Sequence, residues 1–229
     1  MKIAIVYFEE NLTGDRSHHQ VSHQMLKGWQ YFYERSQTAF EPCLILDDAT
    51  QPPSFWKYGH VRASSPNPPS RIDVLNKVGW LKSQAYDLLG KCVVMDLDAL
   101  LLDKIDELED FSSEIAMSPD GGTIRDDWEW IKDWPEAKKK YNAGVLFLNS
   151  DRILPRFREL WDEKSEYLRI TYFDEIIFSS MLTEMNGLIL DTSFNTPWSG
   201  DIDYHGSRVL HFSGDRKSAM LPFLAKQVI

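Results

Sequence analysis

Two aspartates, Asp96 and Asp98, follow an apolar run at a spacing that could hold a divalent cation. The run, Cys92 to Met95, is continuously apolar, as expected for a strand buried on both faces of a sheet. Residues i and i+2 of a strand point the same way, and ligands of open α/β sheets bind at the carboxyl ends of strands. Two carboxylates so close repel each other unless a cation lies between them or one takes a proton. We therefore predict a metal site; the alternative is a polar loop, where Asp is common.

Other residues with reactive side chains carry weaker signals. His19 and His23 stand at i, i+4 near the start of an expected helix, a spacing that could bind a metal. We favour a solvated helix face for them, because no third ligand is nearby. The two cysteines, Cys43 and Cys92, lie in apolar runs. They are expected to be buried thiols in a reducing compartment, not a disulfide.

The elements that would position the aspartates alternate between strand and helix. Before the Asp-x-Asp run we expect a strand at 2–8, a helix at 18–36, a strand at 42–46, a long ordered loop at 51–70, and a helix at 71–89 that ends at Gly90. After it we expect a short acidic helix at 105–111, strands at 114–117 and 141–148, helices at 151–168 and 173–185, strands at 187–190 and 208–212, and a basic, partly apolar tail. The tryptophan-rich stretch 126–134 is either a flap or a lid. This order predicts an α/β fold with a largely parallel sheet flanked by helices.

Composition narrows the class of protein. The 229 residues suffice for one large domain, and 43% of them are hydrophobic, which indicates a globular protein. The net charge of -10 argues against nucleic acid or an anionic membrane as the main partner. The first apolar run is followed at once by Glu9 and Glu10 and is too short for a signal peptide or a membrane span. We expect a cytoplasmic soluble protein; the sequence does not indicate its oligomeric state.

Several motifs follow one another in the order of a known family. They are Lys91 to Asp98 with Ile105 to Leu108, Ser118-Pro119-Asp120, Tyr141 to Val145, Asp174-Glu175, Phe194-Asn195, and His211 to Lys217. The last of these has the family's pattern His-Phe-x-Gly-x-x-Lys. Together these motifs resemble glycogenin and related retaining glycosyltransferases of family 8, over residues 77 to 217.

The resemblance implies a GT-A fold over residues 1–229 as a single domain with a mostly parallel central sheet. It implies a nucleotide-sugar donor, UDP-glucose or UDP-galactose, and transfer of the hexosyl group with retention to an acceptor glycan, protein or lipid. It also implies a Mn²⁺ (or Mg²⁺) ion held by Asp96, Asp98 and His211. Mn²⁺ accepts carboxylate oxygen and imidazole nitrogen, which suits this set. The alternative for His211 is a buried core histidine.

The resemblance assigns further roles residue by residue. The implied donor-binding residues are Tyr7, Lys82, Asp96, Leu97, Gly214 and Lys217, with Lys77 as the alternative to Lys82. Gly214 would let backbone N–H groups approach a phosphate, and Lys217 would add a point charge there. The implied catalytic residues, which would hydrogen-bond sugar hydroxyls, are Asp120, Asn142 and Asp174. The alternatives are cap or turn residues for these three, a solvated helix lysine for Lys82 and a half-buried strand-end residue for Tyr7.

The sequence differs from the family pattern at a few positions, and two other classes of protein are alternatives. Glu175 replaces the usual glutamine, a charge that would alter the sugar accepted, and Ser218-Ala219 replace Pro-Trp. One rival is a haloacid-dehalogenase-type phosphatase with Asp96 as nucleophile, but that motif needs Thr or Val where Leu100 stands and usually opens its fold. A second rival is a non-catalytic nucleotide-sugar-binding protein, against which the intact set of metal and phosphate residues argues.

Overall fold

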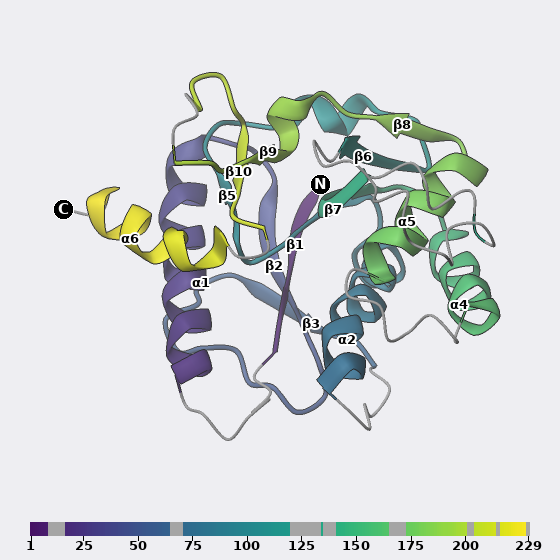
Figure 1. Ribbon diagram of the computed structural model, residues 1–229, viewed down its shortest axis with the longest axis horizontal. Helices are drawn as coiled ribbons and strands as arrows, with labels where there is room; N and C mark the ends of the chain where they lie inside the picture. Colours follow the sequence, from purple (N-terminus) through teal and green to yellow (C-terminus); the bar gives the residue numbers. More distant parts are fainter. Residues whose placement is uncertain are drawn as a thin grey trace.

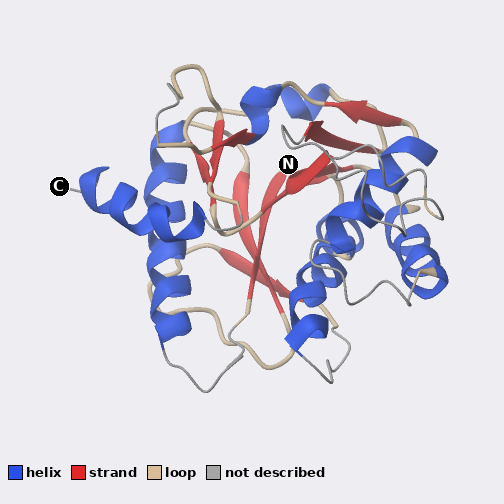
Figure 2. Cartoon of the chain, in the orientation of Figure 1, coloured by secondary structure: helices blue, strands red, loops and turns tan. Residues whose placement is uncertain are grey.

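The computed structural model describes residues 1–8, 17–64, 71–119, 134, 141–164, 173–200, 204–213 and 216–227; for 17–21 and 71–75 it describes the backbone alone. Strands and helices alternate through the first half of the chain, and a twisted sheet runs through the middle of the molecule (Figure 1). Helices lie on both sides of this sheet (Figure 2). The α/β class expected from the sequence is therefore confirmed.

The main sheet of the described residues contains seven strands. In spatial order they are β3 (Gly59–Arg62), β2 (Glu41–Leu46), β1 (Lys2–Tyr7), β4 (Cys92–Met95), β7 (Tyr141–Leu148), β6 (Ile115–Pro119) and β8 (Gly187–Ile189). Strands β3, β2, β1 and β4 pair in parallel, as do β6 and β8. Only the pairings of β7 with β4 and β6 are antiparallel among these strands, so the sheet is mostly parallel, as expected.

A second, three-stranded sheet lies next to the carboxyl end of β4. It contains β5 (Ala99–Leu101), β10 (Val209–His211) and β9 (Thr196–Pro197). Strand β10 runs antiparallel to β5, and His211 is in register with Ala99. This pairing brings His211 next to Asp98, although more than a hundred residues separate them in the sequence.

Six α-helices and two short 3₁₀ segments belong to the described chain. They are α1 (Ser17–Ser36), α2 (Arg71–Ser83), α3 (Ala85–Leu89), α4 (Ile153–Glu163), α5 (Phe173–Glu184), α6 (Lys217–Gln227), η1 (Asp106–Asp110) and η5 (Thr192–Asn195). The helix expected at 71–89 is divided into α2 and α3, and the expected C-terminal tail is the helix α6. The loop expected at 51–70 contains the strand β3, and β5 and β9 were not expected either.

The two faces of the main sheet bury two separate cores. Along β1, Ile3, Ile5 and Tyr7 face one core, while Ala4 and Val6 face the other, as the two-residue period of a strand requires. The first core is covered by α1 and α6, and the second by helices α2 to α5 (Figure 1). Because both faces are covered, the central strands carry continuous apolar runs.

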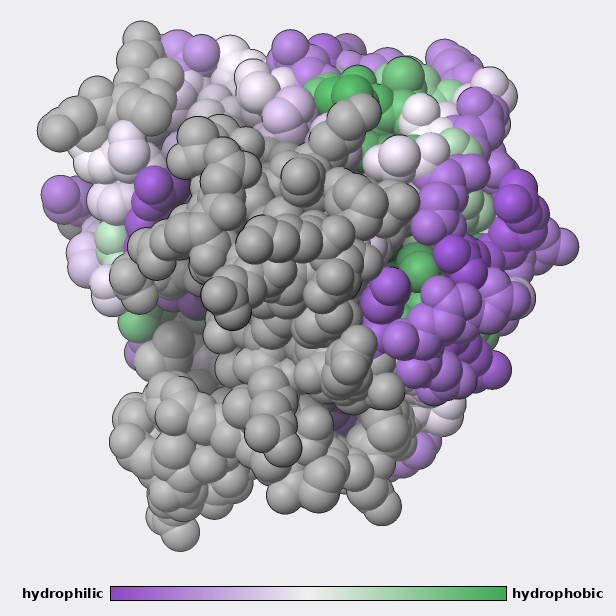
Figure 3. Space-filling view, turned by 45° about the vertical axis from the view of Figure 1, so that its right-hand side comes forward, coloured by the Kyte–Doolittle hydropathy of each residue, from purple (hydrophilic) through white to green (hydrophobic). Residues whose placement is uncertain are grey.

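The described surface is mostly polar. Among the described residues the large hydrophobic side chains that are exposed are Leu88, Leu188 and Ile189. In Figure 3, most of the side chains that are not grey are hydrophilic, and a hydrophobic patch lies among them at the upper right. Both cysteines are buried free thiols, as expected. No described helix combines the length and the apolar character needed to cross a bilayer.

Candidate metal and donor site

A turn that follows β4 positions the two aspartates. Strand β4 ends at Met95, and the backbone N–H of Ala99 donates to the carbonyl of Asp96 at 3.0 Å, which closes the turn. Both aspartates therefore follow the strand, in a turn, and their side chains converge. Two backbone hydrogen bonds to distant parts of the sequence fix the turn. The N–H of Asp96 donates to the carbonyl of Gly144 at 2.8 Å, and the N–H of Phe212 donates to the carbonyl of Asp98 at 2.9 Å.

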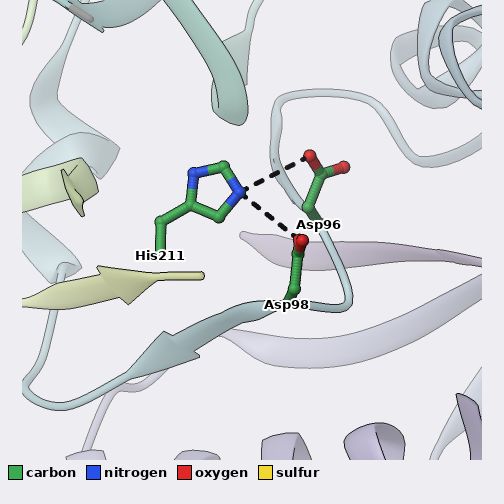
Figure 4. A group of neighbouring side chains, drawn as sticks. All are labelled: Asp96, Asp98 and His211. Atoms are coloured by element: carbon green, nitrogen blue, oxygen red, sulfur yellow. Dashed lines mark ion pairs between the residues drawn. The ribbon is translucent and has the colours of Figure 1, made fainter. Parts of the chain in front are cut away.

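His211 completes a cluster of three ligands. Its Nε2 lies 3.3 Å from Asp98 Oδ1 and 4.0 Å from Asp96 Oδ2. Figure 4 shows the imidazole of β10 facing both carboxylates of the turn. One ligand atom from each residue lies within 4.8 Å of the others. Two carboxylates and an imidazole are a donor set that suits Mn²⁺, so the residues fit the ion that the resemblance implies.

Gly144 on β7 makes room for the imidazole. A Cβ built at this position would lie 2.2 Å from His211 Cε1 and 2.5 Å from His211 Nδ1. It would also lie 2.8 Å from Asn142 Oδ1. Any side chain at position 144 would therefore displace His211, Asn142 or both, and the glycine is required by this close approach.

Lys82 links the carboxylates of Asp96 and Asp174. Its Nζ lies 2.7 Å from Asp96 Oδ1 and 3.5 Å from Asp174 Oδ2, and it donates to Ala143 O at 3.0 Å. The side chain is buried, which opposes the charge, yet Asp96 and Asp174 raise the pKa of Lys82 above its ordinary value. Lys77, the alternative to Lys82, instead pairs with Asp47 at 2.7 Å.

A second lysine reaches the cluster from the start of α6. Lys217 Nζ lies 3.1 Å from Asp98 Oδ2, and its side chain is 59% exposed. Burial alone would raise the pKa of Asp98, but His211 and Lys217 hold it well below its ordinary value. Asp98 in turn raises the pKa of Lys217. These contacts therefore favour the charged carboxylate of Asp98, which is the form that binds a cation.

Two of the residues expected at the sugar, Asn142 and Asp174, lie near this cluster. Asn142 Oδ1 accepts the N–H of Gly144 at 2.7 Å and the amide of Asn195 at 2.8 Å. Asp174 lies in the first turn of α5, where a Cβ built on Gly79 of α2 would be 2.2 Å from its Cβ. The two helices thus approach closely at this glycine. Glu175 is buried, at 9% exposure.

The remaining predicted residues are less closely connected with the cluster. Tyr7 is 1% exposed, with the His23 ring parallel to its own at 6.1 Å between centroids. Its contact with a base stays a prediction, as does the role of Leu97, which is packed against the first core. Asp120 and Gly214 lie outside the described residues, as do the His19 side chain and the 126–134 stretch except for Trp134.

Three residues of the site received no role from the sequence. Gly79 and Gly144 allow close approaches, and Asn195 contacts Asn142. Gly144 and Asn195 stand within motifs on which the resemblance rests. The motifs indicate that both residues lie near the site, but they do not indicate what either residue does. Gly79 is an isolated glycine in a helix, where it is unfavourable without a packing reason, and that was the available signal.

Comparison with known proteins identifies the fold. No protein-family model matches the sequence, and no curated protein is similar to it in sequence. An active-site mutant of LgtC has a similar structure, with 13% identity, TM-score 0.65 and coverage of 99% of this chain and 96% of that one. Mouse xyloside xylosyltransferase 1 has 12% identity and a TM-score of 0.56, with 93% of this chain and 97% of that chain covered. The glycosyltransferase GlyE of Streptococcus pneumoniae TIGR4 has 13% identity and a TM-score of 0.57, with 99% of this chain and 64% of that chain covered. The chain therefore has the GT-A fold of these glycosyltransferases.

Proposed function

We propose that this protein is a metal-dependent glycosyltransferase of the family 8 type that transfers a hexosyl group from a nucleotide sugar. The observation that carries the proposal is the convergence of Asp96, Asp98 and His211 from two distant strand ends. The GT-A fold supports it, because ligands of such sheets bind at the carboxyl ends of strands, where these residues lie. We extend the proposal to residues 1–229 as one domain.

The residues have distinct parts in this proposal. Asp96, Asp98 and His211 would hold a Mn²⁺ or Mg²⁺ ion, which when bound acts as a Lewis acid that neutralises charge on the departing nucleoside diphosphate. Lys217 adds a cation at the same end of the site. Lys82 fixes the side chains of Asp96 and Asp174 relative to each other through its two ion pairs.

The sugar end of the site lies around Asn142 and Asp174. Their amide and carboxylate can hydrogen-bond the hydroxyls of a hexose. By resemblance the donor is UDP-glucose or UDP-galactose and the anomeric configuration is retained. The acceptor is a glycan, a protein or a lipid. For an α-linked donor, NMR of the isolated product should show an α linkage, and a β linkage would contradict retention.

The test is a screen of nucleotide sugars with and without Mn²⁺. We expect one UDP-hexose to be consumed with release of UDP, only when the metal is present. Asp98→Asn keeps the shape of the side chain but removes its charge, and should abolish the metal dependence and the turnover. Circular dichroism of this variant checks that the fold is intact. Consumption of no nucleotide sugar, together with no UDP binding by calorimetry, would overturn the proposal.

A further inference from the structure

A buried asparagine, Asn195, contacts the side chain expected at the sugar. Asn195 ends η5 and is 3% exposed. Its Nδ2 lies 2.8 Å from Asn142 Oδ1 and 3.5 Å from the carbonyl oxygen of Asn142. Because the Asn142 carbonyl can only accept, the amide end of Asn195 that faces Asn142 must be the NH₂ group.

The orientation of Asn142 is fixed in the same way. Its Oδ1 accepts the backbone N–H of Gly144 at 2.7 Å, and a backbone N–H can only donate. The oxygen therefore takes bonds from Gly144 and Asn195, which occupy its two lone pairs. The side chain of Asn142 is half-buried, and no described residue accepts a bond from its Nδ2, which is left for a ligand. This end of the site thus offers N–H donors to a bound molecule.

The buried side chain of Asn195 lowers the stability of the fold through its carbonyl oxygen. Among the described residues, no donor reaches its Oδ1, although the atom is buried. A buried acceptor without a partner is unfavourable, and a hydrophobic residue of similar size would avoid the cost. A role in holding Asn142 accounts for the presence of an amide at this position.

The Asn142 amide lies beside the metal cluster. A Cβ built on Gly144 would approach both Asn142 Oδ1, at 2.8 Å, and His211 Cε1, at 2.2 Å. The amide and the imidazole are therefore neighbours across one glycine. His211 Nε2 faces the two aspartates. A donor whose phosphates bind at these aspartates would place its sugar within reach of this region.

We propose that Asn195 is a positioning residue that holds the Asn142 amide with its NH₂ group toward the sugar of the donor. Asn195 does not touch the substrate; it acts through Asn142. The site then selects a sugar atom that accepts a hydrogen bond, namely a hydroxyl oxygen. This inference rests on the proposed glycosyltransferase function. It adds the residue that makes the sugar site present a hydrogen-bond donor rather than an acceptor.

The test compares binding of UDP-glucose, UDP-galactose and UDP to the full chain in the presence of Mn²⁺. For the UDP-hexose that binds more tightly, Asn195→Ala should weaken binding about tenfold, the effect of one lost hydrogen bond, and leave UDP binding unchanged. Asn142→Ala should have the same selective effect. The double variant should bind no more weakly than Asn142→Ala alone, because Asn195 acts through Asn142.

Asn142→Asp is a matched variant, because it keeps the size and shape of the wild-type side chain. Its carboxylate keeps an oxygen that can accept from Gly144 and Asn195, so it should melt within a few degrees of the wild type. It replaces the outward NH₂ by an oxygen that cannot donate, so a sugar hydroxyl can bind it only by turning its own O–H toward it. The preference for the UDP-hexose over UDP should therefore fall in this variant rather than vanish. This variant also tests the inference if Asn195→Ala does not fold.

Three outcomes would overturn the inference. One is equal weakening of UDP and UDP-hexose binding by Asn195→Ala, which indicates a merely structural role. Another is additive effects of Asn195→Ala and Asn142→Ala, and a third is an Asn142→Asp variant whose UDP-hexose preference is undiminished. Failure of the wild-type protein to bind any of the three nucleotides would instead overturn the proposed function itself.

Discussion

Lys217 and His211 contact the two oxygens of one carboxylate, that of Asp98. Lys217 Nζ lies 3.1 Å from Oδ2, and His211 Nε2 lies 3.3 Å from Oδ1. A cation that binds Asp98 would therefore share it with a lysine that is largely exposed and can move away. The same lysine lies where the leaving phosphates are expected, so it would affect metal and nucleotide binding in opposite directions.

Lys217→Ala should tighten Mn²⁺ binding in the absence of nucleotide and weaken UDP binding in its presence. The first effect should be a few-fold, because the lysine is largely exposed and solvent screens its charge, although Asp98 itself is buried. The second should cost about 1–3 kcal/mol, as for a charge-assisted hydrogen bond. Calorimetry measures both. Lys226→Ala, an exposed lysine in the last turn of the same helix, is the control, and equal behaviour of the two variants would refute the prediction.

Gly144→Ala should disrupt the metal cluster while most of the fold persists. The added Cβ would lie 2.2 Å from His211 Cε1, so the imidazole must move away from the aspartates. We expect a loss of about 1–3 kcal/mol in stability from overpacking and at least a tenfold loss in Mn²⁺ affinity. Gly59→Ala is the matched control, because among the described residues its Cβ would meet only Cys43 Sγ, at an ordinary 3.9 Å. Unchanged Mn²⁺ affinity in Gly144→Ala would show that the close approach is not needed.

Lys82→Met should destabilise the protein by on the order of 3 kcal/mol, because it leaves Asp96 and Asp174 without their shared cation. Mn²⁺ should then raise the melting temperature of the variant more than that of the wild type, since the ion supplies positive charge at Asp96. Lys91→Met is the control, because Lys91 bonds to backbone carbonyls, among them that of Phe111 at 2.8 Å. An equal rise in wild type and variant would argue against electrostatic coupling.

The buried pair Asp47–Lys77 should make the stability of the protein depend on pH. Burial alone would raise the pKa of Asp47, but bonds from Lys77 and Thr50 hold it below its ordinary value of 3.8. The folded state thus binds this proton more weakly than the unfolded chain. The stabilisation is present above the ordinary pKa and is lost as the pH falls through the lower folded-state pKa.

Urea unfolding of wild type and Asp47→Asn from pH 7 downward checks this. The difference in free energy of unfolding should be constant near neutral pH and shrink below about pH 4. Asp48→Asn, at an exposed neighbouring position, is the control. A difference that stays the same down to the lowest pH at which both proteins fold would contradict the assignment.

The parts of the fold that the sequence predicts are those with a continuous physical signal. The apolar run of β4 and the carboxylates after it identify the centre of the site, and the order of motifs indicates the fold. Strand β3 is mostly exposed, so it lacks such a run, and Pro222 inside α6 argues against a helix there. The choice between Lys77 and Lys82 depends on tertiary packing. The contact of Asn195 with Asn142, which are 53 residues apart, also depends on tertiary packing. No local sequence pattern predicts this contact or the choice between the two lysines.

The most direct test of the central claim follows the fate of the phosphates. The protein is incubated with the UDP-hexose that it consumes and Mn²⁺, and both the small-molecule products and the intact chain are analysed by mass spectrometry. We predict release of intact UDP, no phosphate on the protein, and loss of turnover in Asp96→Asn, because Asp96 only holds the metal. Orthophosphate release with a phosphorylated Asp96 would contradict the account and indicate a phosphatase.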